Sequence, residues 1–251
     1  MELIEPPRVN VADRLSDSAR ILPEVPAVVE AWGNRRSITF AELDRDADML
    51  ARGLVEIGVE PQLRMALLVK PSIKFVTLVF ALLRSGATMI LVDAGLGARN
   101  IVHCLQSTNP DGFVAIPIGQ ALRVIRRSAF PKAKINVTVG RRIFWGGKTF
   151  EGLANVGVLS DVPLPHTAAN DSAAIVFTSG STGPPKGVVY RHETFATQLT
   201  EIERVYDLKA GGVDLACFPL FGLFNVALGI TTVLPDMDFS RPAAADPKKL
   251  L

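Results

Sequence analysis

The chain has 251 residues, enough to bury a large core in one large domain or two small ones. Its net charge of +2 does not indicate a nucleic-acid partner, and we expect none. The arginine pair at 126–127 is interpreted as part of a solvated helix face.

Targeting and compartment signals are weak. The N-terminal residues MELIEPPRVN have no basic stretch and no apolar core, so they do not form a signal peptide. The most apolar stretch, Phe75–Leu83, is too short to span a bilayer, so no transmembrane segment is expected. Cys104 and Cys217 cannot form a disulfide framework, which favours a reducing compartment and a cytoplasmic location. The mean hydropathy of +0.28 is high, which predicts apolar surface that lines a lipid-sized pocket or faces a further part of the protein.

The first predicted elements are a capped helix over 10–21 and a β-hairpin over 27–31 and 36–40. Thr39 and Glu42 form a capping-box pattern that begins a helix, and Gly58 ends it. Strands and helices then alternate. We expect strands at 64–69, 87–92, 112–116 and 133–139, and helices from Ser72 to Gly86, over 98–107 and over 119–128.

This alternation predicts an α/β fold with a mainly parallel sheet flanked by helices. Residues 140–147 form a predicted turn-rich excursion, and the proline-rich residues 159–170 form a connector. We therefore divide the chain into a first α/β subdomain over 1–160 and the start of a second over 171–251. The second subdomain contains a predicted helix over 191–206.

The C-terminus carries the signal of a helix start. Asp246 and Pro247 are typical of an N-cap and a first helical turn. A single turn is not stable alone, so we expect this chain to be the N-terminal part of a longer polypeptide. The remainder of that polypeptide is then its first partner.

The most distinctive segment is FTSGSTGPPKG, which follows the apolar run 173–177. Hydroxyl groups and glycine N–H groups of such a loop can approach phosphate oxygens closely, and a lysine adds positive charge. The segment therefore predicts a polyphosphate-binding loop. The residues assigned to it are Thr178, Ser179, Gly180, Ser181, Thr182, Gly183, Lys186 and Gly187.

Three other interpretations are disfavoured. The segment is not the loop of P-loop NTPases, because Pro185 precedes the lysine and Gly187 follows it. A flexible linker seldom ends in Pro-Lys-Gly followed at once by an apolar strand. A dinucleotide-binding turn at Gly95 and Gly97 lacks its third glycine, since Asn100 stands there.

The loop resembles the signature of adenylate-forming enzymes, which include acyl-CoA synthetases, peptide-synthetase adenylation domains and luciferases. The segments ITFAEL at 38–43 and LRSGATMILVD at 83–93 are similar to two further motifs of that family. The resemblance extends from about Pro26 onward. It implies that ATP is bound by the loop and Mg²⁺ beside it, with Thr182 as a metal contact. It also implies a helix-start or supporting role for His192.

The next motif of the family departs from its pattern at FPLFGLFN, residues 218–225. Family members usually have an aromatic residue followed by histidine, whereas here Phe221 is followed by Gly222. The expected substrate-pocket residues are Phe221, Gly222 and Phe224. The glycine is expected either to widen the pocket for a bulky, branched acyl chain or to be a neutral loop substitution.

The segments at 137–147, 186–195 and 211–243 resemble the branch of the family that closes 2-alkyl-3-hydroxy fatty acids to β-lactones in bacterial olefin biosynthesis. The run PDMDFSRPA at 235–243 is the most particular match. This implies a long-chain acyl substrate, with enzymes of the same pathway as candidate partners. A long-chain fatty acid–CoA ligase, which uses coenzyme A, and a non-catalytic nucleotide- or acyl-binding module remain alternatives. The family's catalytic residues lie later in its sequence, so none is expected within 1–251 and the piece alone should be inactive.

Overall fold

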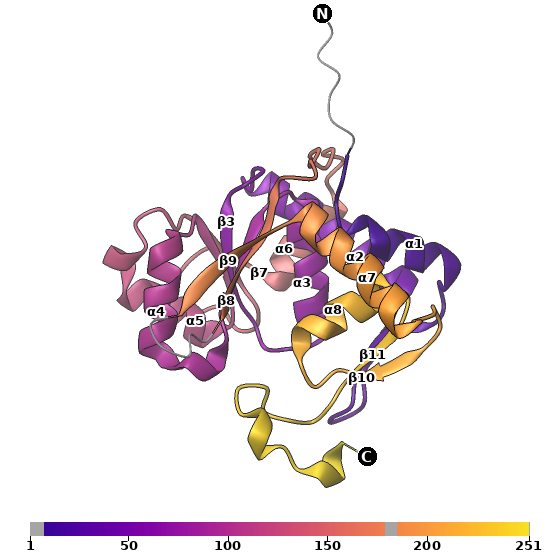
Figure 1. The fold of residues 1–251 in the computed structure, drawn as a ribbon. Coiled ribbons are helices and arrows are strands. Elements are labelled where there is room, and N and C mark those ends of the chain that lie inside the picture. Colours follow the sequence, from indigo (N-terminus) through magenta and orange to yellow (C-terminus); the bar gives the residue numbers. More distant parts are fainter. Residues whose placement is uncertain (1–7, 179–184, 251) are drawn as a thin grey trace, which may run out of the picture.

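The computed structural model describes residues 8–178 and 185–250, and its centre is a seven-stranded sheet (Figure 1). The strand order is β7-β6-β5-β3-β4-β8-β9, and every neighbouring pair is parallel except the β8–β9 pair. The predicted α/β fold with a mainly parallel sheet is confirmed. The strands are β3 (Arg64–Leu68), β4 (Thr88–Leu91), β5 (Gly112–Ala115), β6 (Ile135–Thr138), β7 (Lys148–Thr149), β8 (Ser172–Thr178) and β9 (Lys186–Arg191).

Helices cover both faces of this sheet, as the alternation of strands and helices predicts. Helices α4 (Gly97–Thr108) and α5 (Pro117–Ile125) lie on one face, on the left in Figure 1. Helices α2 (Phe40–Glu56) and α3 (Ile73–Arg84) pack on the other face, with α6 (Phe150–Val158) against α2. Because both faces are covered, the inner strands are almost continuously apolar.

A second, four-stranded sheet has the order β10-β11-β1-β2. Strand β1 (Pro26–Glu30) pairs antiparallel with β2 (Ser37–Thr39), which confirms the predicted hairpin, and parallel with β11 (Thr231–Leu234). Strand β10 (Val213–Leu215) is an outer strand. Helices α1 (Asp13–Ile21) and α8 (Pro219–Ala227) pack against each other beside this sheet, and α7 (His192–Tyr206) follows β9.

Side-chain hydrogen bonds cap two of the predicted helices and the short turn at the C-terminus, whereas α1 begins after Ala12 without a side-chain cap. The Thr39 hydroxyl accepts a hydrogen bond from Glu42 N at 3.2 Å, and the Glu42 carboxylate accepts one from Thr39 N at 2.9 Å. The Ser72 hydroxyl likewise accepts from Phe75 N at 3.2 Å. At the C-terminus, Asp246 accepts from Lys248 N and caps a 3-10 turn over Pro247–Lys249. At these positions, short-range sequence signals were therefore sufficient to predict where the element begins.

Helix α6 is absent from the sequence prediction. Its sequence, FEGLANVGV, contains two glycines, which lower the intrinsic helix propensity. The structure stabilises it through the Thr149 hydroxyl, which accepts from Gly152 N at 3.0 Å, and through packing on α2.

Both sheets combine strands from before and after the connector at 159–170, since β8 pairs with β4 and β11 pairs with β1. The division into subdomains 1–160 and 171–251 stays a prediction. Across the described ranges 8–178 and 185–250, no helix is both long and apolar enough to cross a membrane.

Candidate functional site

The predicted phosphate-binding segment connects β8 to β9 in the sequence, and the structure describes its two flanks. Its flanks pair in register, with Thr178 opposite Lys186 and Phe177 opposite Gly187. A side chain at Gly187 would meet the Phe177 ring at 3.1 Å, so the glycine lets this ring pack across the hairpin. Lys186 is exposed as the first residue of β9. The remaining loop residues assigned from the sequence, Ser179, Gly180, Ser181, Thr182 and Gly183, lie outside the described residues.

An apolar cavity of about 240 Å³ lies beside this hairpin. Helix α3, strands β4, β8 and β9, and helices α7 and α8 supply most of its wall. Phe221 and Phe224, two of the residues expected in the substrate pocket, both line this cavity. The other lining residues are Val11, Val79, Phe80, Leu83, Met89, Leu91, Val176, Tyr190, Phe195, Gln198, Leu199, Phe218, Leu220, Leu223 and Ala227.

Aromatic contacts give this cavity a fixed wall. Tyr190 and Phe195 stack with ring centroids 5.1 Å apart, and Phe195 meets Phe224 edge to face at 6.1 Å. Phe218 and Phe221 form a second edge-to-face pair at 5.4 Å, and each is more than half exposed (52% and 56%). The cavity therefore has a packed inner part and an outer part of exposed rings, a form suited to a long apolar chain.

Gly222 is not among the residues that line the cavity. Its missing Cβ would lie 2.9 Å from Thr232 Cγ2, and its carbonyl accepts from the Thr232 hydroxyl at 3.0 Å. The glycine therefore allows α8 to pack closely on β11. A role for Gly222 in widening the substrate pocket stays a prediction.

One polar group on the cavity wall has no partner. Gln198 Oε1 is buried and accepts no hydrogen bond from any described residue. An unmatched buried acceptor costs about 1–3 kcal/mol, and a hydrogen-bond donor from water or a ligand would remove this cost. No sequence motif marks Gln198, because its only context is one turn of an amphipathic helix.

His192 is fully buried at the first position of α7. Its Nδ1 accepts from Val11 N at 3.3 Å, and its Nε2 has no partner among the described residues. Burial lowers the pKa of His192 from 6.5 to about 4, although the nearby Asp171 carboxylate opposes the shift. The imidazole is therefore neutral at pH 7, and the helix-start position expected from the sequence is confirmed.

The depressed pKa predicts a loss of stability in acid. Between pH 6.5 and about 4, His192 is protonated in the unfolded chain but neutral in the folded chain. The contribution of this residue to the free energy of unfolding is therefore complete above pH 6.5 and is lost as the pH falls towards 4. The loss should reach about 3 kcal/mol. Urea unfolding at pH 4.5 and 7 should show a smaller pH effect in His192→Gln, while the exposed His166→Gln should match the wild type. Equal pH effects in all three proteins would contradict this.

Over 8–178 and 185–250 no group of three or more His, Cys, Asp or Glu side chains could hold a metal ion. The predicted metal contact, Thr182, lies outside the described residues.

A hairpin whose connecting segment has the predicted phosphate-binding sequence lies beside an apolar cavity on a mainly parallel sheet, which is the arrangement expected of a nucleotide-dependent acyl-activating protein. The sequence profile of the family described as AMP-binding enzyme matches residues 15–236. The chain belongs to this family.

Two curated relatives match nearly the whole chain. An olefin beta-lactone synthetase of Xanthomonas campestris pv. campestris is 47% identical over 249 residues, and one of Stenotrophomonas maltophilia is 42% identical over 250. Both alignments cover 96% of this chain and 45% of the relative, so the chain spans about half the length of these proteins.

Solved structures agree on the fold. A long-chain-fatty-acid-CoA ligase from Archaeoglobus fulgidus superposes with a TM-score of 0.79 at 22% identity, covering 92% of this chain and 48% of that one. The N-terminal domain of FACL13 from Mycobacterium tuberculosis gives 0.77 at 21% identity, covering 93% and 59%. At these identities the likeness shows the fold alone.

Proposed function

We propose that the chain is the N-terminal part of an ATP-dependent, AMP-forming enzyme that activates a long-chain 3-hydroxy fatty acid and closes it to a β-lactone. The observation that carries the proposal is the identity of 42–47% to two olefin beta-lactone synthetases over nearly the whole chain. The apolar cavity beside the β8–β9 hairpin supports an acyl substrate. Each buried CH₂ of such a chain contributes about 0.8 kcal/mol.

The proposed reaction has two steps. A carboxylate oxygen of the acid bonds to the α-phosphorus of ATP, the bond to the bridging oxygen breaks, and pyrophosphate leaves. The 3-hydroxyl oxygen then bonds to the acyl carbon, AMP leaves with the electron pair, and the hydroxyl proton is released. The second step is intramolecular, so proximity supplies much of its rate. The exposed Lys186 would hold the pyrophosphate charge during the first step.

Gln198 supports a hydroxylated substrate over a plain fatty acid. Its buried amide oxygen has no hydrogen-bond partner among the described residues, within a wall that is otherwise almost wholly apolar. Either end of the amide can pair with a hydroxyl group, which both donates and accepts. A substrate without a hydroxyl group leaves the amide unmatched.

ATP is the proposed nucleotide, and Mg²⁺ would neutralise charge on its phosphates when bound. Because the described residues contain no metal-binding group, no step is assigned to the ion. A cytoplasmic location belongs to the proposal and rests on the two free cysteines, Cys104 and Cys217.

The alternative is a long-chain fatty acid–CoA ligase, in which the thiol of coenzyme A attacks the acyl-AMP. A FadD13 ligase of Mycobacterium tuberculosis matches 92% of this chain, but at only 24% identity. A non-catalytic module is the remaining alternative, since a fold does not by itself define an activity.

The products distinguish these possibilities. The full protein should be incubated with ATP, Mg²⁺ and a 2-alkyl-3-hydroxy acid, with and without coenzyme A, and the products identified by mass spectrometry. We expect β-lactone in both tubes. A thioester that forms only with coenzyme A, without lactone, would establish the ligase, and an absence of AMP in both tubes would favour the module.

A further inference from the structure

Positive charge is concentrated in one part of the chain. Residues 94–150 contain nine lysines and arginines and one acidic residue, Asp111, so this segment carries +8. The whole chain carries +2, which leaves the rest at −6. A segregation this strong creates a local positive potential that the small net charge conceals.

Within this segment, helix α5 and the loop 140–147 lie side by side. A side chain at Gly140 would meet Pro117 Cδ at 3.6 Å, at the start of the helix. Further along α5, Arg123 Nη2 donates to Trp145 O at 3.1 Å, and Trp145 Nε1 donates to Thr138 Oγ1 at 3.0 Å. The loop is therefore held along the helix by specific bonds, and its exposed side chains have a defined position.

This helix and loop expose four large apolar side chains. We call these side chains, together with Arg126, Arg127, Arg141 and Arg142, the α5 surface. Positions 118 and 125 are two helical turns apart and share a face of α5, while Gly119 and Gln120 are buried on the other side. The apolar members and their exposed fractions are Ile118 at 75%, Ile125 at 77%, Ile143 at 61% and Phe144 at 75%.

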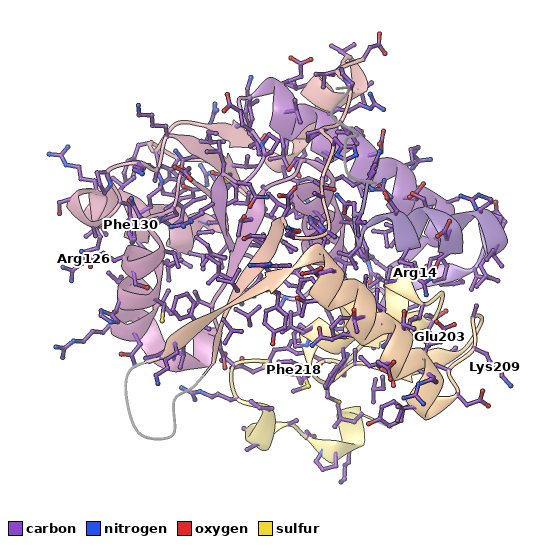
Figure 2. All side chains as sticks on the ribbon, turned by 45° about the horizontal axis from the view of Figure 1, so that its top comes forward. Arg14, Arg126, Phe130, Glu203, Lys209 and Phe218 are labelled. Carbon is purple, nitrogen blue, oxygen red and sulfur yellow. The ribbon has the colours of Figure 1, made fainter. Side chains whose placement is uncertain are left out.

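Arginines flank these apolar side chains at both ends. Arg126 and Arg127 follow Ile125 directly, and Arg141 and Arg142 precede Ile143; all four are exposed. Among the described residues none of them forms an ion pair. Figure 2 shows Arg126 at the opposite edge of the molecule from Arg14 and Lys209.

We propose that the α5 surface binds the surface of an anionic lipid bilayer, with the arginines at the headgroups and the four apolar side chains inserted below them. Exposed aliphatic and aromatic side chains flanked by basic residues are the combination that binds at this depth of an anionic membrane. A nucleic acid would use the charge but not four exposed apolar side chains. The inference goes beyond the proposed function, and it would place the protein where long-chain acids dissolve.

The role of the arginines can be tested by co-sedimentation of the full protein with phosphatidylcholine vesicles, with and without phosphatidylglycerol. Binding should require phosphatidylglycerol and weaken at high salt. Each basic residue near an anionic surface contributes about fivefold in affinity, so Arg126→Glu with Arg127→Glu should lower binding by tenfold or more. The matched control, Arg204→Glu with Lys209→Glu, changes the same charge near the opposite edge and should bind as the wild type.

A second pair of variants tests insertion. Ile125→Ser with Phe144→Ser should weaken vesicle binding several-fold even at low salt, while the exposed pair Val205→Ser with Tyr206→Ser should not. Equal binding to neutral and anionic vesicles, no vesicle binding, or wild-type binding by both α5-surface variants would overturn the proposal. So would tighter binding to duplex DNA or RNA of the same total charge. Vesicle binding needs no substrate, so this result is independent of the lactone assay.

Discussion

Replacing Lys186 with alanine should slow pyrophosphate release by the full protein about 100-fold or more, if the proposed ATP site is correct. Lys186 is exposed at the first position of β9, opposite Thr178 at the end of β8, so its ammonium group is free to reach an anion at the hairpin tip. Positive charge aimed at the leaving pyrophosphate acts mainly in the transition state. The loss should therefore appear in kcat more than in the KM for the fatty acid.

Lys148→Ala is the matched control for this prediction. Lys148 is also an exposed first residue of a strand, β7, but it lies at the other end of the seven-stranded sheet. Its removal should leave pyrophosphate release within about twofold of the wild type. Similar activity in Lys186→Ala and the wild type would reject the phosphate-binding role of the hairpin while leaving the fold assignment intact.

Local chemistry made most of the fold predictable. The capping box at Thr39 and the serine cap at Ser72 join residues three positions apart, and the β1–β2 hairpin pairs residues at most 13 positions apart. The alternation of strands with helices then restricts the topology to a parallel sheet. Helix α6 was missed because packing on α2, and not its own propensity, determines it.

The cavity could be predicted only in part. The FPLFGLFN segment indicated Phe221 and Phe224, and both line the cavity, while their role in a substrate pocket stays a prediction. Val79 on α3 and Gln198 on α7 are far from that motif in sequence, and only the tertiary fold brings them to the same wall. Gly222 belongs to the same motif, but the structure places it against Thr232 and outside the cavity lining.

Composition was a poor guide to the α5 surface. The pair Arg126–Arg127 was interpreted as a solvated helix face, and the net charge of +2 indicated no acidic partner. The excess of +8 over residues 94–150 is visible in the sequence once charge is counted by segment. The contact between Arg123 and Trp145, which joins the two exposed segments into one surface, comes only from the fold.

Gly157→Ala should lower the free energy of unfolding by about 2–3 kcal/mol. Helices α2 and α6 touch through their backbones, because an added Cβ at Gly157 would overlap the Met49 carbonyl oxygen. Gly53 on α2 makes the reciprocal approach, with its missing Cβ 2.6 Å from Leu153 O. Neither obstacle is a flexible side chain, so the helices must separate and expose buried surface. This loss should exceed the gain of about 1 kcal/mol in helix propensity.

Gly152→Ala in the same helix separates packing from propensity. An added Cβ there meets only the Thr149 hydroxyl oxygen, at 3.1 Å, so the propensity gain should offset the contact and stability should change by less than about 0.5 kcal/mol. Urea unfolding of the wild type, both alanine variants and Gly53→Ala measures these differences. We expect the Gly53 and Gly157 variants to unfold at clearly lower urea and Gly152→Ala to coincide with the wild type. If Gly157→Ala were as stable as Gly152→Ala, the close backbone contact between α2 and α6 would be wrong, because no rearrangement of side chains can relieve an overlap with a carbonyl oxygen.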